Sequence, residues 1–146
     1  MNLNGDIIII EDDIDDAEIL IELFQKVFNE NHYSNKVVHI STPETVVDFM
    51  NNQTESPFLI ISDINMPKLD GFALREIIFN DPVLNEKCVP YIFLTTSGDD
   101  HDFMKRAYKL SIQGYFKKPN DFNEYYNLLN DIVRYWKVAK LANRRY

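Results

Sequence analysis

Short apolar runs alternate with longer amphipathic segments from one end of the chain to the other. The run that leads into Asp63, Phe-Leu-Ile-Ile-Ser, has no alternation of polar and apolar residues, which is typical of a strand buried on both faces of a parallel sheet. Four other short runs of similar length predict further strands. The five expected strands lie at residues 6–11, 36–41, 58–63, 90–95 and 114–118.

Helical periodicity occupies the intervals between these strands. After the first strand, for example, Leu20, Leu23, Phe24 and Val27 recur at the spacing of one helix face. Because strands and helices alternate five times with short connections, the chain predicts a parallel sheet with helices on both faces. The five expected helices lie at about residues 15–30, 43–52, 71–81, 99–110 and 121–142.

Capping and breaking residues set the expected helix ends. Thr42 offers a capping hydroxyl to the second helix, and Pro43 stands at its first position. Asp81-Pro82 is expected to stop the third helix, and Asn120 to cap the last one. With 146 residues, the chain is expected to form a single domain over residues 1–146, with an extended C-terminal helix.

Charge and composition narrow the class of protein. The net charge of −8 at pH 7 argues against nucleic acid as the main partner, although five basic and no acidic residues follow from Arg134 onward. No apolar run approaches the roughly 20 residues that span a bilayer, and the first residues do not resemble a signal peptide. The single cysteine, Cys88, fits a reducing compartment. These features predict a cytoplasmic protein with no membrane contact.

Acidic side chains stand where two of the expected strands end. Glu11 and Asp12 follow the first strand, and Asp63 follows the third. If these strands are neighbours, the carboxylates meet in one pocket, because parallel strands end at the same edge of a sheet. A hard divalent cation such as Mg²⁺ would neutralise their mutual repulsion. The alternative is an acidic rim without function.

Two further strand ends offer a hydroxyl and an ammonium group. Thr95 ends the fourth strand, and Lys118 ends the fifth. A phosphoryl group on Asp63 would need a metal ion, a hydrogen-bond donor and a cation around its oxygens. Each residue alone is ordinary, since threonine is common in strands and lysine is usually solvated. The joint placement of acids, hydroxyl and lysine at successive strand ends is the specific signal.

At this point the chain resembles the CheY-like receiver domains of two-component response regulators, from Ile7 to about Val138. The resemblance implies a flavodoxin-like (βα)5 fold, a doubly wound α/β architecture with a five-stranded parallel sheet in the order 2-1-3-4-5. The matching pieces are Ile-Ile-Ile-Ile-Glu-Asp-Asp at 7–13, Ser-Asp-Ile-Asn-Met-Pro-Lys-Leu-Asp-Gly at 62–71, Phe-Leu-Thr-Thr-Ser at 93–97 and Gly-Tyr-Phe-Lys-Lys-Pro at 114–119.

The resemblance implies a role for each matching acid. Asp63 would be the phosphoacceptor, and Asp12 would ligate Mg²⁺ directly. Glu11 would act on the metal mainly through water, and Asn65 would offer its backbone carbonyl. Asp13 is expected to be peripheral.

The same resemblance implies how phosphorylation is read out. Thr95 and Lys118 would contact the phosphoryl oxygens, and the bond between Lys118 and Pro119 would be cis. Thr95 would draw Tyr115 inward as a switch. Asn65 and Ser97 would tune the lifetime of the phosphorylated state.

The implied function is that of a stand-alone receiver. Asp63 would take a phosphoryl group from a histidine kinase or a phosphotransfer protein, with Mg²⁺ as cofactor and no turnover beyond its own phosphorylation and dephosphorylation. The last helix carries a second apolar stripe, which includes Leu128, Tyr135, Val138 and Ala142. This stripe favours an interface, either with a second copy of the chain or with a kinase. The Ile-Val-Arg-Tyr-Trp run also resembles the final helix of Rcp-type phytochrome-associated regulators.

Three other interpretations compete with this one. A flavodoxin would need a donor-rich phosphate loop after the first strand, where this chain has Glu-Asp-Asp-Ile-Asp-Asp. A haloacid-dehalogenase-like phosphatase would need an Asp-x-Asp motif after its first strand and a substrate cap. A degenerate receiver would lack the acceptor or the lysine, and both residues are present here.

Overall fold

Five parallel strands form one central sheet in the computed structural model, which describes residues 3–144. Their order is β2-β1-β3-β4-β5, as the receiver resemblance implies. The chain reverses its direction of sheet growth between β1 and β3, and in open α/β sheets such a point creates the ligand-binding crevice. The strands are β1 (Ile7–Ile10), β2 (Val37–Ile40), β3 (Leu59–Ser62), β4 (Tyr91–Thr95) and β5 (Gly114–Lys117).

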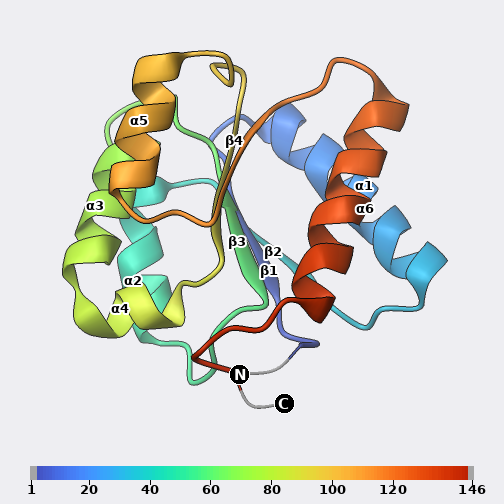
Figure 1. Ribbon diagram of the computed structural model, residues 1–146, viewed down its shortest axis with the longest axis horizontal. Coiled ribbons are helices and arrows are strands. Elements are labelled where there is room, and N and C mark those ends of the chain that lie inside the picture. The colour runs from blue at the N-terminus through green and yellow to red at the C-terminus, as the bar shows by residue number, and fades with distance from the viewer. Residues whose placement is uncertain (1–2, 145–146) are drawn as a thin grey trace.

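Helices cover both faces of this sheet (Figure 1). Helices α1 (Ile14–Asn31) and α6 (Phe122–Val138) lie side by side on one face. The other face carries the remaining helical segments, which are η1 (Pro43–Thr45), α2 (Val46–Asn51), α3 (Gly71–Asn80), α4 (Pro82–Lys87) and α5 (His101–Lys109).

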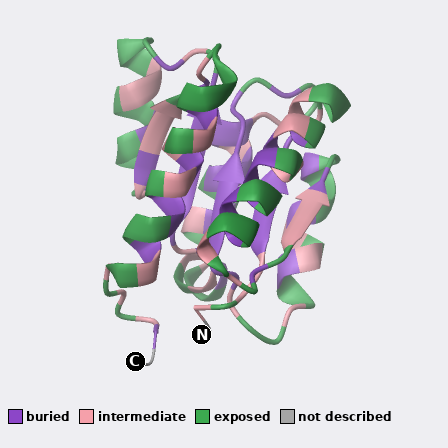
Figure 2. Cartoon of the chain, turned by 90° about the vertical axis from the view of Figure 1, so that its right-hand side faces the viewer, coloured by how far each residue is buried: buried purple, intermediate pink, exposed green. Residues whose placement is uncertain are grey.

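Two apolar layers follow from the alternation of side chains along the strands. Ile7 and Ile9 of β1 point into the layer under α1 and α6, whereas Ile8 and Ile10 point into the opposite layer. Figure 2 shows the resulting band of buried residues through the middle of the molecule. Every residue of β1, β3 and β4 is buried, which explains why their sequences are continuously apolar.

The boundary at Asp81-Pro82 differs from the expectation. Helix α3 does end there, but the same residues start α4, a short helix that the sequence analysis did not predict. Asp81 caps α4 by accepting hydrogen bonds from the backbone N–H groups of Val83 and Leu84. Pro82 has no N–H to donate, so it fits the first helical position. One Asp-Pro pair therefore both stops and starts a helix.

Two expected caps are wrong. The hydroxyl of Thr42 makes no capping hydrogen bond, because η1 begins as a 3-10 turn and Thr45 Oγ1 instead donates to the carbonyl of Thr42. Helix α6 is capped by Asp121, which accepts from the N–H of Glu124, and not by Asn120. Aspartate at the residue directly before the helix has the right reach for this bond.

The C-terminal helix is shorter than expected. It ends at Val138, and the chain then turns back beneath the amino ends of the strands (Figure 1). Arg144 is buried there and donates to the carbonyls of Trp136 and Phe58. The prediction that the helix continues to residue 142 is therefore wrong. The guanidinium of Arg144 donates to a carbonyl in the last turn of α6, which has no partner within the helix once the helix ends there.

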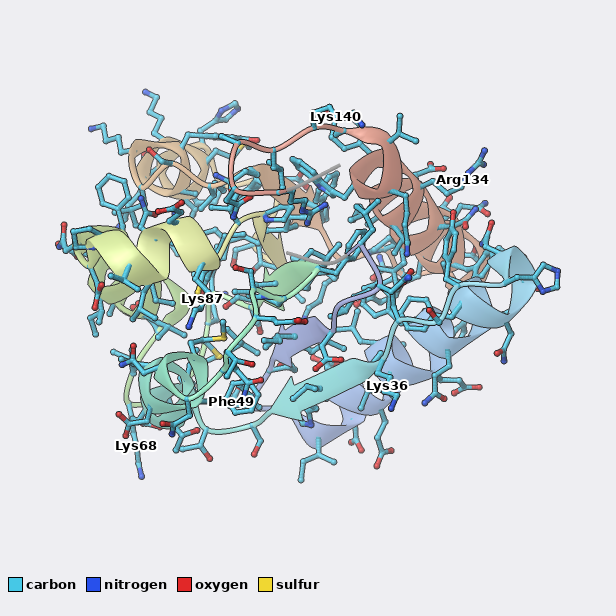
Figure 3. All side chains as sticks on the ribbon, turned by 90° about the horizontal axis from the view of Figure 1, so that it is seen from below. Lys36, Phe49, Lys68, Lys87, Arg134 and Lys140 are labelled. Carbon is cyan, nitrogen blue, oxygen red and sulfur yellow. The ribbon has the colours of Figure 1, made fainter. Side chains whose placement is uncertain are left out.

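Basic side chains are distributed over several elements. In the view from the amino edge of the strands, Lys36, Lys87, Arg134 and Lys140 lie apart from one another (Figure 3). Lys87 is used structurally, since its ammonium donates to the carbonyls of Met50 and Gln53.

The thiol of Cys88 is buried, and burial raises its pKa to about 12. A thiol in this state is a poor nucleophile.

Candidate functional site

The sheet ladder fixes the residues of the site at the carboxyl edge of the strands. Hydrogen bonding between strands continues one residue past each strand end. The N–H of Asp63 donates to Ile10 at 3.0 Å, and the N–H of Lys118 donates to Thr95 at 2.9 Å. The backbone positions of Asp63, Lys118 and Thr95 are therefore set by the most regular part of the fold.

Three carboxylates meet at this edge, as the sequence predicts. One oxygen from each of Glu11, Asp12 and Asp63 lies within 4.8 Å of the other two. Glu11 is 1% exposed and Asp63 is 9% exposed. Burial, and then the charge of Asp63, raises the pKa of Glu11 to about 7. This uncompensated negative charge, offered by hard oxygen ligands, fits a divalent cation such as Mg²⁺ or Mn²⁺.

Asp63 is held in one orientation within this cluster. Its Oδ1 accepts the backbone N–H of Ile64 at 2.8 Å, and its Oδ2 faces Lys118. Gly71 closes the loop from behind, since a Cβ at that position would lie only 2.3 Å from the carbonyl oxygen of Asp63. The loop after β3 can therefore pack against α3 only with glycine there.

Lys118 connects the carboxylates. Its Nζ lies 3.1 Å from Glu11 Oε2, 3.4 Å from Asp16 Oδ2 and 3.5 Å from Asp63 Oδ2. Burial acts to lower the pKa of Lys118, but the charges of Asp63 and Glu11 outweigh it and leave the pKa above the ordinary value. The lysine therefore places a positive charge beside Asp63 Oδ2, the oxygen that does not accept the N–H of Ile64.

Ser97 is the centre of the second loop of the site. Its N–H donates to Thr95 Oγ1 at 3.2 Å, and its carbonyl accepts from the hydroxyl of Tyr115 at 3.0 Å. Its own Oγ accepts from Asn65 Nδ2 at 2.9 Å, which bridges the loops after β3 and β4. Four residues that the receiver resemblance assigns to switching and lifetime are thus directly linked.

One geometric expectation for this site is wrong. The bond between Lys118 and Pro119 is not cis, and within residues 3–144 the cis bond is that between Val89 and Pro90. The trans form is the lower-energy isomer of most bonds before proline, and with it Lys118 reaches Glu11, Asp16 and Asp63.

Sequence reasoning missed one member of the site. Asp16 contacts Lys118, and no motif pointed to it. Its place in the acidic run that follows the first strand, in the first turn of α1, was the available signal. Asp13 caps α1 by accepting the N–H of Asp16, which gives it the peripheral role that was expected.

A doubly wound parallel sheet with acids, a hydroxyl and a lysine at its carboxyl edge defines a receiver-type signalling domain. A family model described as "Response regulator receiver domain" matches residues 7–130. The chain therefore belongs to the receiver-domain family of two-component response regulators. This membership decides against the flavin-binding and phosphatase alternatives.

Known proteins of similar sequence and fold support the assignment. The chain is 25% identical to the response regulator Rcp1 of a Synechocystis species over 128 residues, which are 84% of this chain and 85% of Rcp1. It is 37% identical over 87 residues to the probable transcriptional regulator ycf29 of Pyropia yezoensis, but these cover 58% of this chain and only 38% of that protein.

Solved structures show the same fold. The phosphorylated cyanobacterial phytochrome response regulator RcpA superposes with a TM-score of 0.81 at 24% identity, covering 95% of this chain and 99% of RcpA. The Mn²⁺-bound form of Rcp1 gives a TM-score of 0.78 at 23% identity, with 94% and 97% coverage. The Rcp-type resemblance noted in the sequence thus holds for the fold.

Within residues 3–144, none of the helices combines the length and the apolar character that a membrane crossing requires.

Proposed function

We propose that this chain is a response regulator that accepts a phosphoryl group on Asp63 in a Mg²⁺-dependent reaction. The donor would be a phosphohistidine of a sensor histidine kinase or of a histidine phosphotransfer protein. The observation that carries the proposal is the set of side chains around Asp63. The carboxylates of Glu11 and Asp12, which could hold a metal ion, and the buried ammonium of Lys118 all converge on the Asp63 carboxylate. We expect the cytoplasm as the location, because these donors act there.

The residues divide the chemistry among themselves. Asp63 Oδ2 attacks phosphorus while the phosphorus–nitrogen bond breaks and its electron pair returns to the donor imidazole. Asp63 Oδ1 stays fixed on the N–H of Ile64 during this step. Lys118 and the hydroxyl of Thr95 would hold the transferred oxygens.

Asp12, Asp63, Glu11 and the carbonyl of Asn65 would hold Mg²⁺, whose charge stabilises the transferring group. The Mn²⁺-bound form of Rcp1 supports a divalent cation at a site of this fold.

The readout would pass through Ser97. Thr95 moves toward the phosphoryl group only if its bond from the Ser97 N–H is released or shifted, and Ser97 also holds Tyr115. Phosphorylation would thereby reposition Tyr115 and the loop before α5. Asn65 and Ser97 would set how fast water reaches the acyl phosphate. Output would be binding to a partner or relay of the phosphoryl group, without nucleic-acid binding by these residues.

The outer face of α6 is the surface that we propose for a second copy of the chain. Tyr135 and Val138 are 62% and 76% exposed, so these two residues of the second apolar stripe face outward. Leu128 is half-buried, and Ala142 lies beyond the end of α6. A groove of about 460 Å³ runs beside it between β5 and α6 and is lined by Phe116, Leu128 and Trp136 among others. Because β5 is also the last strand of the sheet, an exposed edge adjoins this groove.

Incubation with acetyl phosphate and Mg²⁺ tests the proposed acceptor. Intact mass should increase by one phosphoryl group in the wild type and not in Asp63→Asn, and a chelator should prevent the gain. Asp70→Asn is a matched control, since Asp70 caps α3 nearby and lies outside the metal cluster. A gain that persists in Asp63→Asn would place the acceptor elsewhere.

The proposed dimer is tested by the double substitution Tyr135→Lys and Val138→Lys. These positions are exposed, whereas deletion from Trp136 onward would remove a core residue. The mass in solution of the phosphorylated protein should fall from two chains to one. An unchanged mass would exclude α6 as the interface.

A further inference from the structure

Asp16 holds the other side of Lys118. It belongs to the first turn of α1, where its backbone is fixed by the cap at Asp13. Its Oδ2 lies 3.4 Å from Lys118 Nζ, a distance close to the 3.5 Å that separates the ammonium from Asp63. These distances, and the 3.1 Å to Glu11, all exceed the roughly 2.8 Å of a strong charge-assisted hydrogen bond, so the ammonium is shared among three carboxylates.

The position of Asp16 separates it from the metal cluster. Its oxygens are not part of the group formed by Glu11, Asp12 and Asp63 among the described residues. Instead, Asp16 and Lys118 line a groove of about 240 Å³ between the first turn of α1 and the start of α6, with Phe122 and Tyr125 on its wall. Asp16 is also the most exposed of the three carboxylates around the lysine, with a side chain 45% exposed.

We propose that Asp16 is a positioning residue that competes with the phosphoryl group for Lys118. In the unmodified protein it keeps the ammonium from closing fully onto Asp63, which leaves the Oδ2 of Asp63 available as a nucleophile. When a phosphoryl group is attached, Lys118 must release Asp16, the most solvated of its three partners, to reach the phosphoryl oxygens. Asp16 thus lowers the affinity of the site for a bound phosphoryl group. This inference rests on the proposed function.

Affinity for beryllofluoride, a mimic of an acyl-bound phosphoryl group, tests the competition. Saturating Mg²⁺ is present, and binding is followed by fluorine NMR. Asp16→Asn should raise the affinity for beryllofluoride about 2- to 5-fold, the range expected when a partly exposed ion pair no longer has to be broken. Binding of Mg²⁺ without fluoride, measured by calorimetry, should stay within about twofold of the wild type, because Asp16 lies outside the metal cluster.

Asp15→Asn is the matched control. Asp15 is exposed, stands in the same first turn of α1 and makes no ion pair among the described residues. It therefore reports the loss of one negative charge near the site without any effect on Lys118. The inference is overturned if Asp16→Asn behaves like Asp15→Asn, lowers the beryllofluoride affinity, or changes Mg²⁺ affinity by as much. A wild-type protein that takes no beryllofluoride at all would instead refute the proposed function.

Discussion

Replacing Glu11 by glutamine should change how the stability of the metal-free protein depends on pH. The Glu11 carboxylate is 1% exposed, with Oε1 3.2 Å from the N–H of Asp13 and Oε2 3.1 Å from Lys118 Nζ. Burial dominates over these favourable contacts and, with the charge of Asp63, raises the pKa of Glu11 from 4.5 to about 7. The folded protein therefore retains a proton on Glu11 at pH values where the unfolded chain has lost it.

The sign and size of the effect follow from this difference in pKa. Between pH 4.5 and about 7 the folded state binds more protons than the unfolded state, so the free energy of unfolding decreases as the pH rises. At about 1.4 kcal/mol for each pKa unit, the wild type should lose up to about 3 kcal/mol over this window. Glu11→Gln carries no such proton, and its stability should lack this loss.

Urea unfolding in chelator at a series of pH values measures the difference. The single tryptophan, Trp136, is buried in α6 and gives a fluorescence signal for the core, and circular dichroism gives an independent one. Carboxylates remote from Glu11 titrate equally in both proteins, so the wild type minus Glu11→Gln reports Glu11 together with its coupled neighbours Asp63 and Lys118. A difference that is constant from pH 4.5 to 8, or that grows in favour of the wild type with rising pH, would refute the reasoning. Mg²⁺ should stabilise the wild type more at pH 8 than at pH 5, because it binds the ionised form.

Two further predictions concern single contacts. Asn65→Ala and Ser97→Ala should each shorten the lifetime of the phosphorylated state about 2- to 10-fold, because each removes the same single hydrogen bond. The double variant should shorten the lifetime no further, and effects that multiply would show that the two residues act separately. Arg75→Ala should lower the free energy of unfolding by about 3 kcal/mol or more, because this fully buried guanidinium donates to carbonyls after α5, including that of Leu110. Arg106 is exposed and lies over the ring of Phe72, so Arg106→Ala should cost about 1 kcal/mol. Equal losses in urea titrations would contradict this reasoning.

The site residues that could be predicted from sequence are those whose positions are fixed by the sheet. Asp63, Thr95 and Lys118 each stand at or directly after the end of an apolar run, and parallel pairing brings such residues to one edge whatever the loops do. A strand pattern of four or five residues is therefore enough to place them. The order of the strands added the remaining information, and that came from family resemblance.

Contacts that depend on side-chain reach across long sequence separations were not predictable. Arg144 meets Phe58, 86 residues away, only because α6 ends early and the tail turns under the sheet. The run of basic residues from Arg134 onward gave no sign of this contact, since charge patterning carries no information on burial. Asp16 likewise contacts Lys118, 102 residues away, because the rotation of α1 about its axis turns Asp16 toward the end of β5.

The excess of acid at the carboxyl edge is best understood as a cost that binding relieves. Glu11, Asp16 and Asp63 surround Lys118, and Asp12 lies beside Glu11 and Asp63. The pKa of Glu11 is raised, because the pocket resists full ionisation. The apolar layers on either side of the sheet stabilise the fold independently of this edge, so the repulsion can be kept there without loss of structure. A cation that enters removes the repulsion and is bound more tightly for it. The same residues that repel one another in this pocket would therefore give it affinity for the divalent cation that the proposed phosphoryl transfer needs.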